Sequence, residues 1–215
     1  MLCAYTTKIV TDIKPPKRAH HEMLYDETTQ SILLLGGSTP LSSGDGIQFL
    51  NDLWKFDGKK WVKIGNIGDE RSGMRLAYDT KRKKIFSYGG FKSDNQAQGQ
   101  LRILENAKWA TLSDMPDMKA AEGGFVYDEQ RDRLIVFGGT PGHGQANGTT
   151  WEWDGSVWKK MSGVAPAARQ GFAMVYDSKR KKTVLFGGMG SSPDQMYTDT
   201  WEYDADGWKK VADNG

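Results

Sequence analysis

The side chains best suited to binding a charged ligand recur at one position of a repeated segment. Arg18, Arg71 and Arg169 each stand eight residues before an aspartate that ends an apolar stretch. A guanidinium presents planar N–H donors that match a carboxylate in two parallel hydrogen bonds. We expect these arginines to rim a channel and to bind an anionic or polar ligand together with five further residues: His20, His21, Arg75, Glu122 and Gln170.

A structural role for the same arginines is the competing interpretation. Each guanidinium would then pair with an acid of a neighbouring repeat, such as Asp52 or Asp199, and hold the repeats together. We favour this second interpretation over ligand binding.

The histidines and the cysteine argue against metal and redox chemistry. His20 and His21 are adjacent, so on a strand they point to opposite faces, and His143 is the only other histidine. Cys3 is a single cysteine, which excludes an internal disulfide. No glycine-rich stretch leads into the Gly-Lys-Ser or Gly-Lys-Thr ending of a phosphate loop. We expect no metal, no cofactor and no catalytic constellation.

Charge and hydropathy narrow the range of partners. The chain has 29 basic and 27 acidic residues, a net charge of +2, which disfavours nucleic acid. The basic runs at 81–84 and 179–182 are expected to be solvated hairpin tips. We see neither a transmembrane segment nor a signal peptide, which leaves the compartment open between the cytoplasm and, for a fragment, secretion.

Three markers repeat together along the chain. The second glycine of a Gly-Gly pair stands at 37, 90, 139 and 188, and a tryptophan stands at 61, 109, 158 and 208. A Tyr-Asp pair ends at 26, 79, 128 and 177, in step with both. A period of about 49 residues is typical of a propeller that has one blade per repeat.

Each repeat contains four short strand-like stretches, a to d, and no stretch has the period of an amphipathic helix. In the first repeat these are residues 19–25, 31–35, 52–56 and a strand that starts at Trp61. We therefore expect an all-β chain of four-stranded antiparallel blades, with repeats at 18–70, 71–118, 119–167 and 168–215. Long polar loops between strands b and c, at 38–50, 91–100, 140–149 and 189–198, are expected to share one face.

The spacing of the Gly-Gly pair, the aromatic strand and the closing tryptophan resembles the kelch repeat of β-propellers. The resemblance covers the chain from Arg18 onward and departs at Arg102, where other repeats have tryptophan, and at Ala120, where they have arginine. Kelch propellers include adaptor modules, carbohydrate oxidases, sugar epimerases and secreted bacterial proteins. A galactose-oxidase-like activity would require a cysteine crosslinked to a tyrosine, and Cys3 lies outside the repeats.

The recurrent glycines and tryptophans are expected to be structural. Glycine permits a positive φ and close approach of two backbones. Tryptophan buries a large area and would fill the space between blades. The glycines are Gly36, Gly37, Gly89, Gly90, Gly138, Gly139, Gly187 and Gly188, and the tryptophans are Trp61, Trp109, Trp158 and Trp208.

Residues 5–10 add a fifth strand of type d within an N-terminal extension at 1–17. We therefore interpret the chain as a segment of a larger ring, which would either self-associate through open blade edges or be marginally stable. The alternative is a four-bladed ring with one surplus strand.

The functional expectation is a non-catalytic binding module that recognises a protein or a glycan through the b–c loops and the channel rim. The alternatives are a sugar-epimerase-like enzyme that uses Glu122 or a channel histidine or arginine as acid or base, and a structural fragment.

Overall fold

A computed structural model describes residues 14–66, 68–115, 117–142 and 144–213 of the 215-residue chain. The expected all-β fold is confirmed, with four four-stranded antiparallel sheets and one two-stranded sheet. The described part of the chain contains no helix that is long and apolar enough to cross a membrane. The predicted strand at 5–10, Cys3 and His143 lie outside the described residues.

The strands of each sheet follow one another along the chain. The first sheet contains β1 (Glu22–Asp26), β2 (Ser31–Leu35), β5 (Asp52–Phe56) and β6 (Trp61–Asn66). The second contains β7 (Ser72–Asp79), β8 (Lys84–Phe91), β9 (Gln100–Glu105) and β10 (Lys108–Asp114). The third contains β11 (Gly124–Asp128), β12 (Arg133–Phe137), β13 (Thr150–Trp153) and β14 (Trp158–Lys160). The fourth contains β15 (Ala173–Asp177), β16 (Lys182–Phe186), β17 (Asp199–Asp204) and β18 (Gly207–Asp213).

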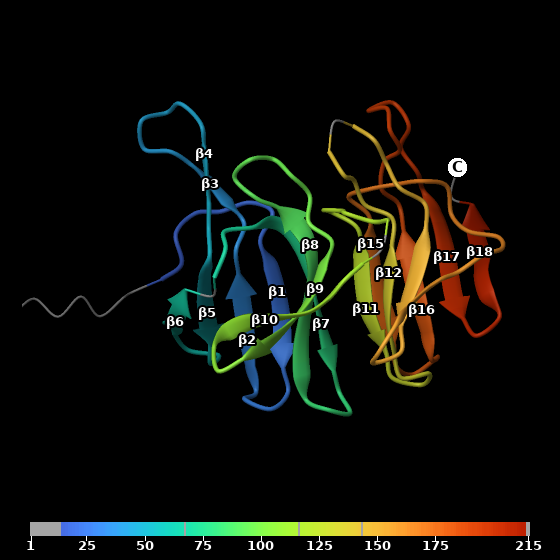
Figure 1. Cartoon of the computed structure of the whole chain (residues 1–215), viewed down its shortest axis with the longest axis horizontal. Helices are drawn as coiled ribbons and strands as arrows, with labels where there is room; N and C mark the ends of the chain where they lie inside the picture. Colours follow the sequence, from blue (N-terminus) through green and yellow to red (C-terminus); the bar gives the residue numbers. More distant parts are fainter. Residues whose placement is uncertain (1–13, 67, 116, 143, 214–215) are drawn as a thin grey trace, which may run out of the picture.

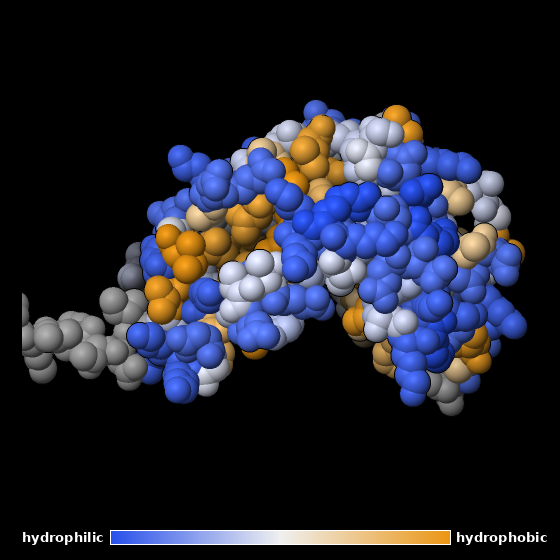
Figure 2. All heavy atoms as spheres, turned by 90° about the horizontal axis from the view of Figure 1, so that it is seen from below, coloured by the Kyte–Doolittle hydropathy of each residue, from blue (hydrophilic) through white to orange (hydrophobic). Residues whose placement is uncertain are grey.

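The four sheets stand side by side like the blades of a propeller (Figure 1). The first strands of consecutive sheets pack against each other, in the order β1, β7, β11 and β15. Seen along the strands, the molecule is an arch with the first and the last sheet as its two arms, and the arms do not meet (Figure 2). Among the described residues, no apolar core joins the fourth sheet to the first.

The core consists of three apolar layers, one at each boundary between consecutive sheets. Strand β12 shows how the sequence builds them. Leu134 and Val136 pack towards the second sheet, whereas Ile135 and Phe137 pack towards the fourth. A strand buried on both faces is an unbroken apolar run, because alternate side chains enter different layers.

The strand predictions are close to the structure. Strands β2 and β5 have the predicted limits of 31–35 and 52–56, β6 starts at Trp61 as predicted, and β1 covers 22–26 where 19–25 was predicted. The segment at 38–50 was expected to be a long polar loop, and it also contains a hairpin of β3 (Ser38–Pro40) and β4 (Ile47–Phe49). The b–c loops lie on one face of the molecule and the a–b turns on the opposite face, as expected (Figure 1).

The closing tryptophans occupy similar positions in three sheets. Trp109, Trp158 and Trp208 lie in the layers between the first and second, second and third, and third and fourth sheets. Trp61 packs on Phe56 at 5.1 Å, as Trp158 and Trp208 pack on Trp153 and Tyr203, but among the described residues no neighbouring sheet covers it.

The Gly-Gly pairs lie where two backbones approach closely. All eight of these glycines have positive φ. At Gly89, where φ is 72°, a Cβ atom would lie 2.1 Å from the carbonyl oxygen of Ala120. The second and third sheets can approach this closely only because residue 89 has no side chain.

Candidate functional site

Arg169 and Arg18 are buried inside their own sheets. The Arg169 guanidinium donates to both carboxylate oxygens of Asp199, at 2.6 and 3.2 Å, and to the carbonyl of Gly187 at 2.9 Å. Trp201 donates its indole N–H to the same carboxylate at 2.8 Å. The first sheet repeats this arrangement with equivalent residues: Arg18, Gly36, Asp52 and Trp54.

These ion pairs correct two expectations. Each acid belongs to the same sheet as its arginine, so the pair connects strands within a blade and does not connect neighbouring blades. The side chains of Arg18 and Arg169 are 3% and 0% exposed, so they do not rim the channel as ligand-binding groups. Burial alone would raise the pKa of Asp199, but hydrogen bonds from Arg169 and Trp201 outweigh it and keep that pKa below its ordinary value.

The second sheet keeps a buried ion pair but takes its acid from another position. Arg71 donates to Asp69 and to Gln100, both at 2.9 Å. Arg102, at the position of the missing tryptophan, donates to Asp69 at 2.7 Å and lies over the Trp109 ring at 5.2 Å. Burial, and then the charge of Arg71, lowers the pKa of Arg102 to about 10. Two arginines therefore share Asp69, and neither is available in the channel.

The third sheet has lost both members of the pair. Ala120 stands at the arginine position and Thr149 at the aspartate position. The indole N–H of Trp151 consequently has no hydrogen-bond partner among the described residues. Because the arginine and the aspartate are absent together, no unpaired charge is buried.

Backbone hydrogen bonds link four equivalent residues at the rim of the channel, one from each sheet. Gly73 N–H donates to the carbonyl of His20 at 3.0 Å, Glu122 N–H to Gly73 at 2.9 Å, and Gly171 N–H to Glu122 at 2.9 Å. All four residues have positive φ, between 52° and 67°. We call this series the rim ladder. It ends at the N–H of His20 and the carbonyl of Gly171, which have no backbone partner in the described part of the chain.

His20 and Glu122 are the two residues of the predicted set that the structure brings together. His20 Nδ1 lies 3.2 Å from Glu122 Oε1, and more than half of the His20 side chain is exposed. They come from the first and third sheets and meet across the second, which has Gly73 at the equivalent position. A Cβ atom at Gly73 would lie 3.2 Å from Glu122 Cγ, so the glycine leaves the space that this contact needs.

His21 and Gln170 do not join this pair. Gln170 is buried and exchanges backbone hydrogen bonds with Met189, at 2.9 and 3.0 Å. Nδ1 of His21 is buried without a partner among the described residues. Burial, and then the charges of Arg18 and His20, lowers the pKa of His21, so this imidazole is neutral at physiological pH.

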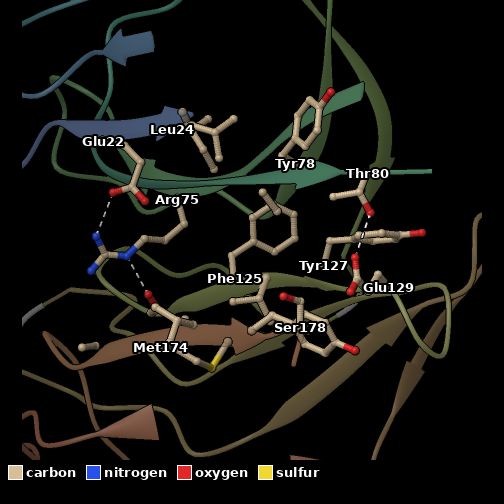
Figure 3. A pocket seen from close by; sticks show the side chains of 18 of the residues that line it. Glu22, Leu24, Arg75, Tyr78, Thr80, Phe125, Tyr127, Glu129, Met174 and Ser178 are labelled. Atoms are coloured by element: carbon tan, nitrogen blue, oxygen red, sulfur yellow. Dashed lines mark hydrogen bonds and ion pairs between the residues drawn. The ribbon is translucent and has the colours of Figure 1, made fainter. Parts of the chain in front are cut away.

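The concave side of the arch contains a cavity of about 510 Å³ between the four innermost strands. Its polar pair is Glu22 and Arg75, which point toward each other (Figure 3). Arg75 Nη1 lies 3.1 Å from Glu22 Oε2, and Arg75 Nε donates to the carbonyl of Gly123 at 2.7 Å. Apolar and aromatic side chains line much of the wall, including Leu24, Tyr78, Phe125, Tyr127 and Met174. Four further polar side chains line the cavity: Glu27, Thr80, Glu129 and Ser178. We call this cavity the channel site.

Arg75 was among the residues predicted from the sequence and Glu22 was not, although the repeat contains a signal for Glu22. Glu22 and Arg75 occupy the same repeat position, fifteen residues before the second glycine of each pair. Equivalent positions of consecutive repeats are neighbours in a propeller, so opposite charges there predict a pair across the blade boundary. The third and fourth repeats have Gly124 and Ala173, whose small side chains leave the cavity open. Burial raises the pKa of Glu22, and Arg75 offsets part of this effect.

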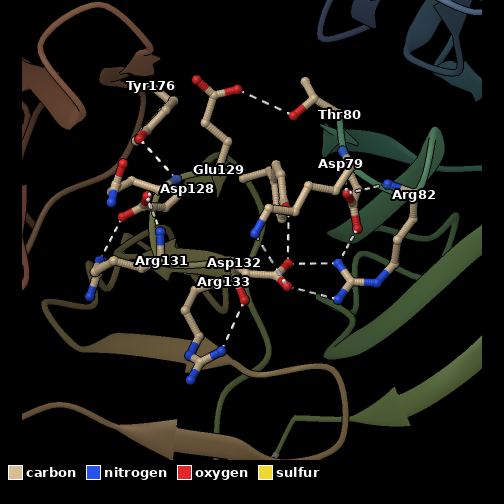
Figure 4. A network of polar contacts seen from close by, with 12 residues as sticks. Asp79, Thr80, Arg82, Asp128, Glu129, Arg131, Asp132, Arg133 and Tyr176 are labelled. Atoms are coloured by element: carbon tan, nitrogen blue, oxygen red, sulfur yellow. Dashed lines mark hydrogen bonds and ion pairs between the residues drawn. The ribbon is translucent and has the colours of Figure 1, made fainter.

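Polar contacts connect the a–b turns of neighbouring sheets at the opposite end of the channel from the rim ladder (Figure 4). Arg82 donates to both carboxylate oxygens of Asp132 in the next sheet, at 2.6 and 2.9 Å, and to Asp79 at 2.7 Å. The hydrogen bonds from Arg82 hold the pKa of Asp132 well below its ordinary value. The basic run at 81–84 is therefore more than a solvated hairpin tip, because one of its members bridges two sheets.

The b–c loop face has exposed apolar side chains. Ile47 in the β3–β4 hairpin is among the most exposed large apolar residues, and Met196 in the fourth b–c loop is similarly exposed. A groove of about 380 Å³ runs between this hairpin and the rim and is lined in part by Pro40, Ile47 and His20.

Comparison with known proteins supports the fold. No protein family model and no curated protein matches the chain. A solved structure of YjhT is similar, with a TM-score of 0.75 and 16% sequence identity, over 91% of this chain and 71% of that one. Identity this low shows a shared fold alone. Within the described residues, no group of three or more potential ligands could hold a metal ion.

Proposed function

We propose that this chain is part of a kelch-type propeller and binds a glycan in the channel site without transforming it. The observation that carries the proposal is the Glu22 and Arg75 pair in a concave cavity that apolar and aromatic side chains also line. Ligand sites typically combine such a wall with a few convergent polar groups. The kelch-like repeat pattern and the four propeller-like sheets support the family assignment.

The chemistry of the cavity suits a sugar. Sugar hydroxyl groups donate to carboxylates and accept from guanidinium groups, while the C–H faces of a sugar ring pack on aromatic side chains. Arg75 uses Nε and Nη1 in protein contacts, and Nη2 makes no hydrogen bond among the described residues. Nη2 would bind a sugar hydroxyl or a carboxylate of an acidic sugar. A volume of about 510 Å³ accommodates a small saccharide.

Calorimetric titration with neutral monosaccharides and with hexuronic acids tests this proposal. We expect Glu22→Gln and Arg75→Met to weaken binding by about tenfold or more, because a hydrogen bond to a charged group contributes about 1.5–3 kcal/mol. Glu105→Gln is the matched control, since Glu105 pairs with Lys84 on the outer surface. Failure of the unmodified protein to bind any of these sugars, or equal binding by all variants, would contradict a glycan site here.

The contact between His20 and Glu122 favours an epimerase-like enzyme as the second candidate. An imidazole and a carboxylate 3.2 Å apart at a channel rim form a plausible general acid and base. The three arginines do not converge on them, which favours binding over catalysis. Incubation of the same sugars in D2O separates the two functions. Deuterium incorporation at a sugar carbon, or faster interconversion of the anomers followed by NMR, would establish catalysis if His20→Gln abolishes it. The absence of both would support binding.

A further inference from the structure

The fourth sheet ends the arch with an uncovered apolar face. Val175 is 60% exposed and Phe186 is 49% exposed. Their equivalents in the third sheet, Val126 and Phe137, are 7% and 0% exposed because the fourth sheet covers them. The last sheet therefore presents to solvent a face that is interior in the preceding repeat.

The first sheet ends the other arm with the complementary face. Tyr25 is 55% exposed and Met23 is 45% exposed. The fourth sheet packs onto the third through residues at these same repeat positions. In the fourth sheet these residues are Met174, Tyr176, Trp201, Tyr203 and Trp208. The first sheet has similar or identical residues at the five equivalent positions, in the same order: Met23, Tyr25, Trp54, Phe56 and Trp61.

The open face of the fourth sheet also has residues equivalent to those that make polar contacts at the boundary between the third and fourth sheets. At that boundary, Arg131 pairs with Glu152 and lies over the Tyr203 ring at 5.0 Å, and Tyr203 donates to Glu152 at 2.8 Å. Trp208 donates to Thr150 at 2.9 Å. The fourth sheet has equivalents of Arg131, Glu152 and Thr150, namely Arg180, Glu202 and Thr200. Arg180 is already paired with Glu202, as Arg131 is with Glu152.

We infer that the open face of the fourth sheet binds the open face of the first sheet of a second copy of this chain, head to tail. The contact would place Phe56 under Arg180 and Trp61 beside Thr200, as Tyr203 and Trp208 are placed in the existing boundary. The rim ladder would continue, with the carbonyl of Gly171 accepting from the N–H of His20 in the next copy. One hydrogen bond is missing, because Phe56 lacks the hydroxyl of Tyr203.

This interface joins two different faces, so copies assemble into a closed ring or into a longer series. It also extends the concave surface, since the channel site is open on the side where the arms of one chain do not meet (Figure 2). Assembly therefore encloses the channel site without requiring that a sugar be its ligand.

The test uses two variants, each with one face blocked by charge. Val175→Lys with Phe186→Lys blocks the fourth sheet, and Met23→Lys with Tyr25→Lys blocks the first. All four residues are substantially exposed, and circular dichroism confirms that each variant is folded. Light scattering coupled to size exclusion then gives the mass of the unmodified chain, of each variant and of their equimolar mixture.

We expect the unmodified chain to have the mass of two or more copies and each variant to have the mass of one. The mixture should form a dimer, because one variant still offers its first sheet and the other its fourth. A single-copy mass for the unmodified chain at all concentrations would overturn the inference. Dimers of either variant alone would also overturn it, since they would show that two like faces bind each other.

If both variants prove unfolded, disulfide crosslinking replaces the mass measurement. It uses Val175→Cys and Tyr25→Cys on separate copies, in a Cys3→Ser background. Absence of a crosslink would refute the interface.

Discussion

Arg169 and Asp199 form two hydrogen bonds inside the fourth sheet, and Trp201 donates a third to the same carboxylate. We expect Asp199→Asn and Arg169→Met each to lower the free energy of unfolding by about 3–5 kcal/mol, because each leaves a buried charge without its partner. The double variant should lose less than the sum of the two. Urea denaturation measures all three. Lys84→Met is the control, because its ion pair with Glu105 is exposed and contributes about 1 kcal/mol or less.

The same carboxylates make the protein sensitive to acid. The pKa values of Asp52, Asp69 and Asp199 are below the ordinary value in the folded chain. Their contribution to stability is therefore complete above the unfolded pKa of about 3.9 and is lost as the pH falls below it. The pKa of Glu22 is raised, so its protonation acts in the opposite direction. Thermal unfolding between neutral pH and pH 2 should show a net loss of stability below about pH 4. A smaller loss is expected in Asp199→Asn, and an unchanged profile would contradict this role of Asp199.

Glu22 and Arg75 occupy equivalent positions of neighbouring sheets, so their charges should be exchangeable. Glu22→Arg alone places two guanidinium groups together and should destabilise the protein. Adding Arg75→Glu restores an opposite-charge pair and should recover most of the loss. Urea denaturation of both single variants and of the double variant measures the coupling. Additive effects would show that the two side chains do not interact.

Gly89→Ala should lower the free energy of unfolding by about 1–3 kcal/mol or more, because the added methyl group would meet the backbone of Ala120. The control is Gly65→Ala in β6, where a Cβ atom has nothing within 4 Å and φ lies outside the left-handed region. Chemical denaturation of both variants provides the comparison. Equal stability of the two would mean that the boundary between the second and third sheets adjusts freely.

The repeat made the strands predictable from the sequence, whereas the side-chain contacts of the site were not predictable in this way. The strands at 31–35 and 52–56 were predictable because apolar periodicity and turn residues are local properties. The partners of Arg18 and Arg169 were harder to assign. Both a neighbouring blade and the same blade contain a suitable acid, and only the folded distances separate them.

Glu22 could have been predicted by aligning the repeats. Within its own repeat, the charge of Glu22 does not indicate a partner. The partner becomes evident only when the first repeat is aligned with the second, where Arg75 occupies the same position. The β3–β4 hairpin is a different case. Its polar, glycine-containing sequence resembles the other loops, and its strands are held mainly by pairing with each other.

The linear arrangement of the sheets sets the order in which the protein opens. Within the described residues, the apolar layers join each sheet only to its neighbours along the chain, so the second and third sheets are supported on both sides and the first and fourth on one side. Opening therefore begins at the arms, as in other arrays with nearest-neighbour contacts. Amide hydrogen exchange should consequently be slowest in β12 and faster in β2 and β16, and head-to-tail assembly would remove this gradient by giving the arms the neighbours they lack.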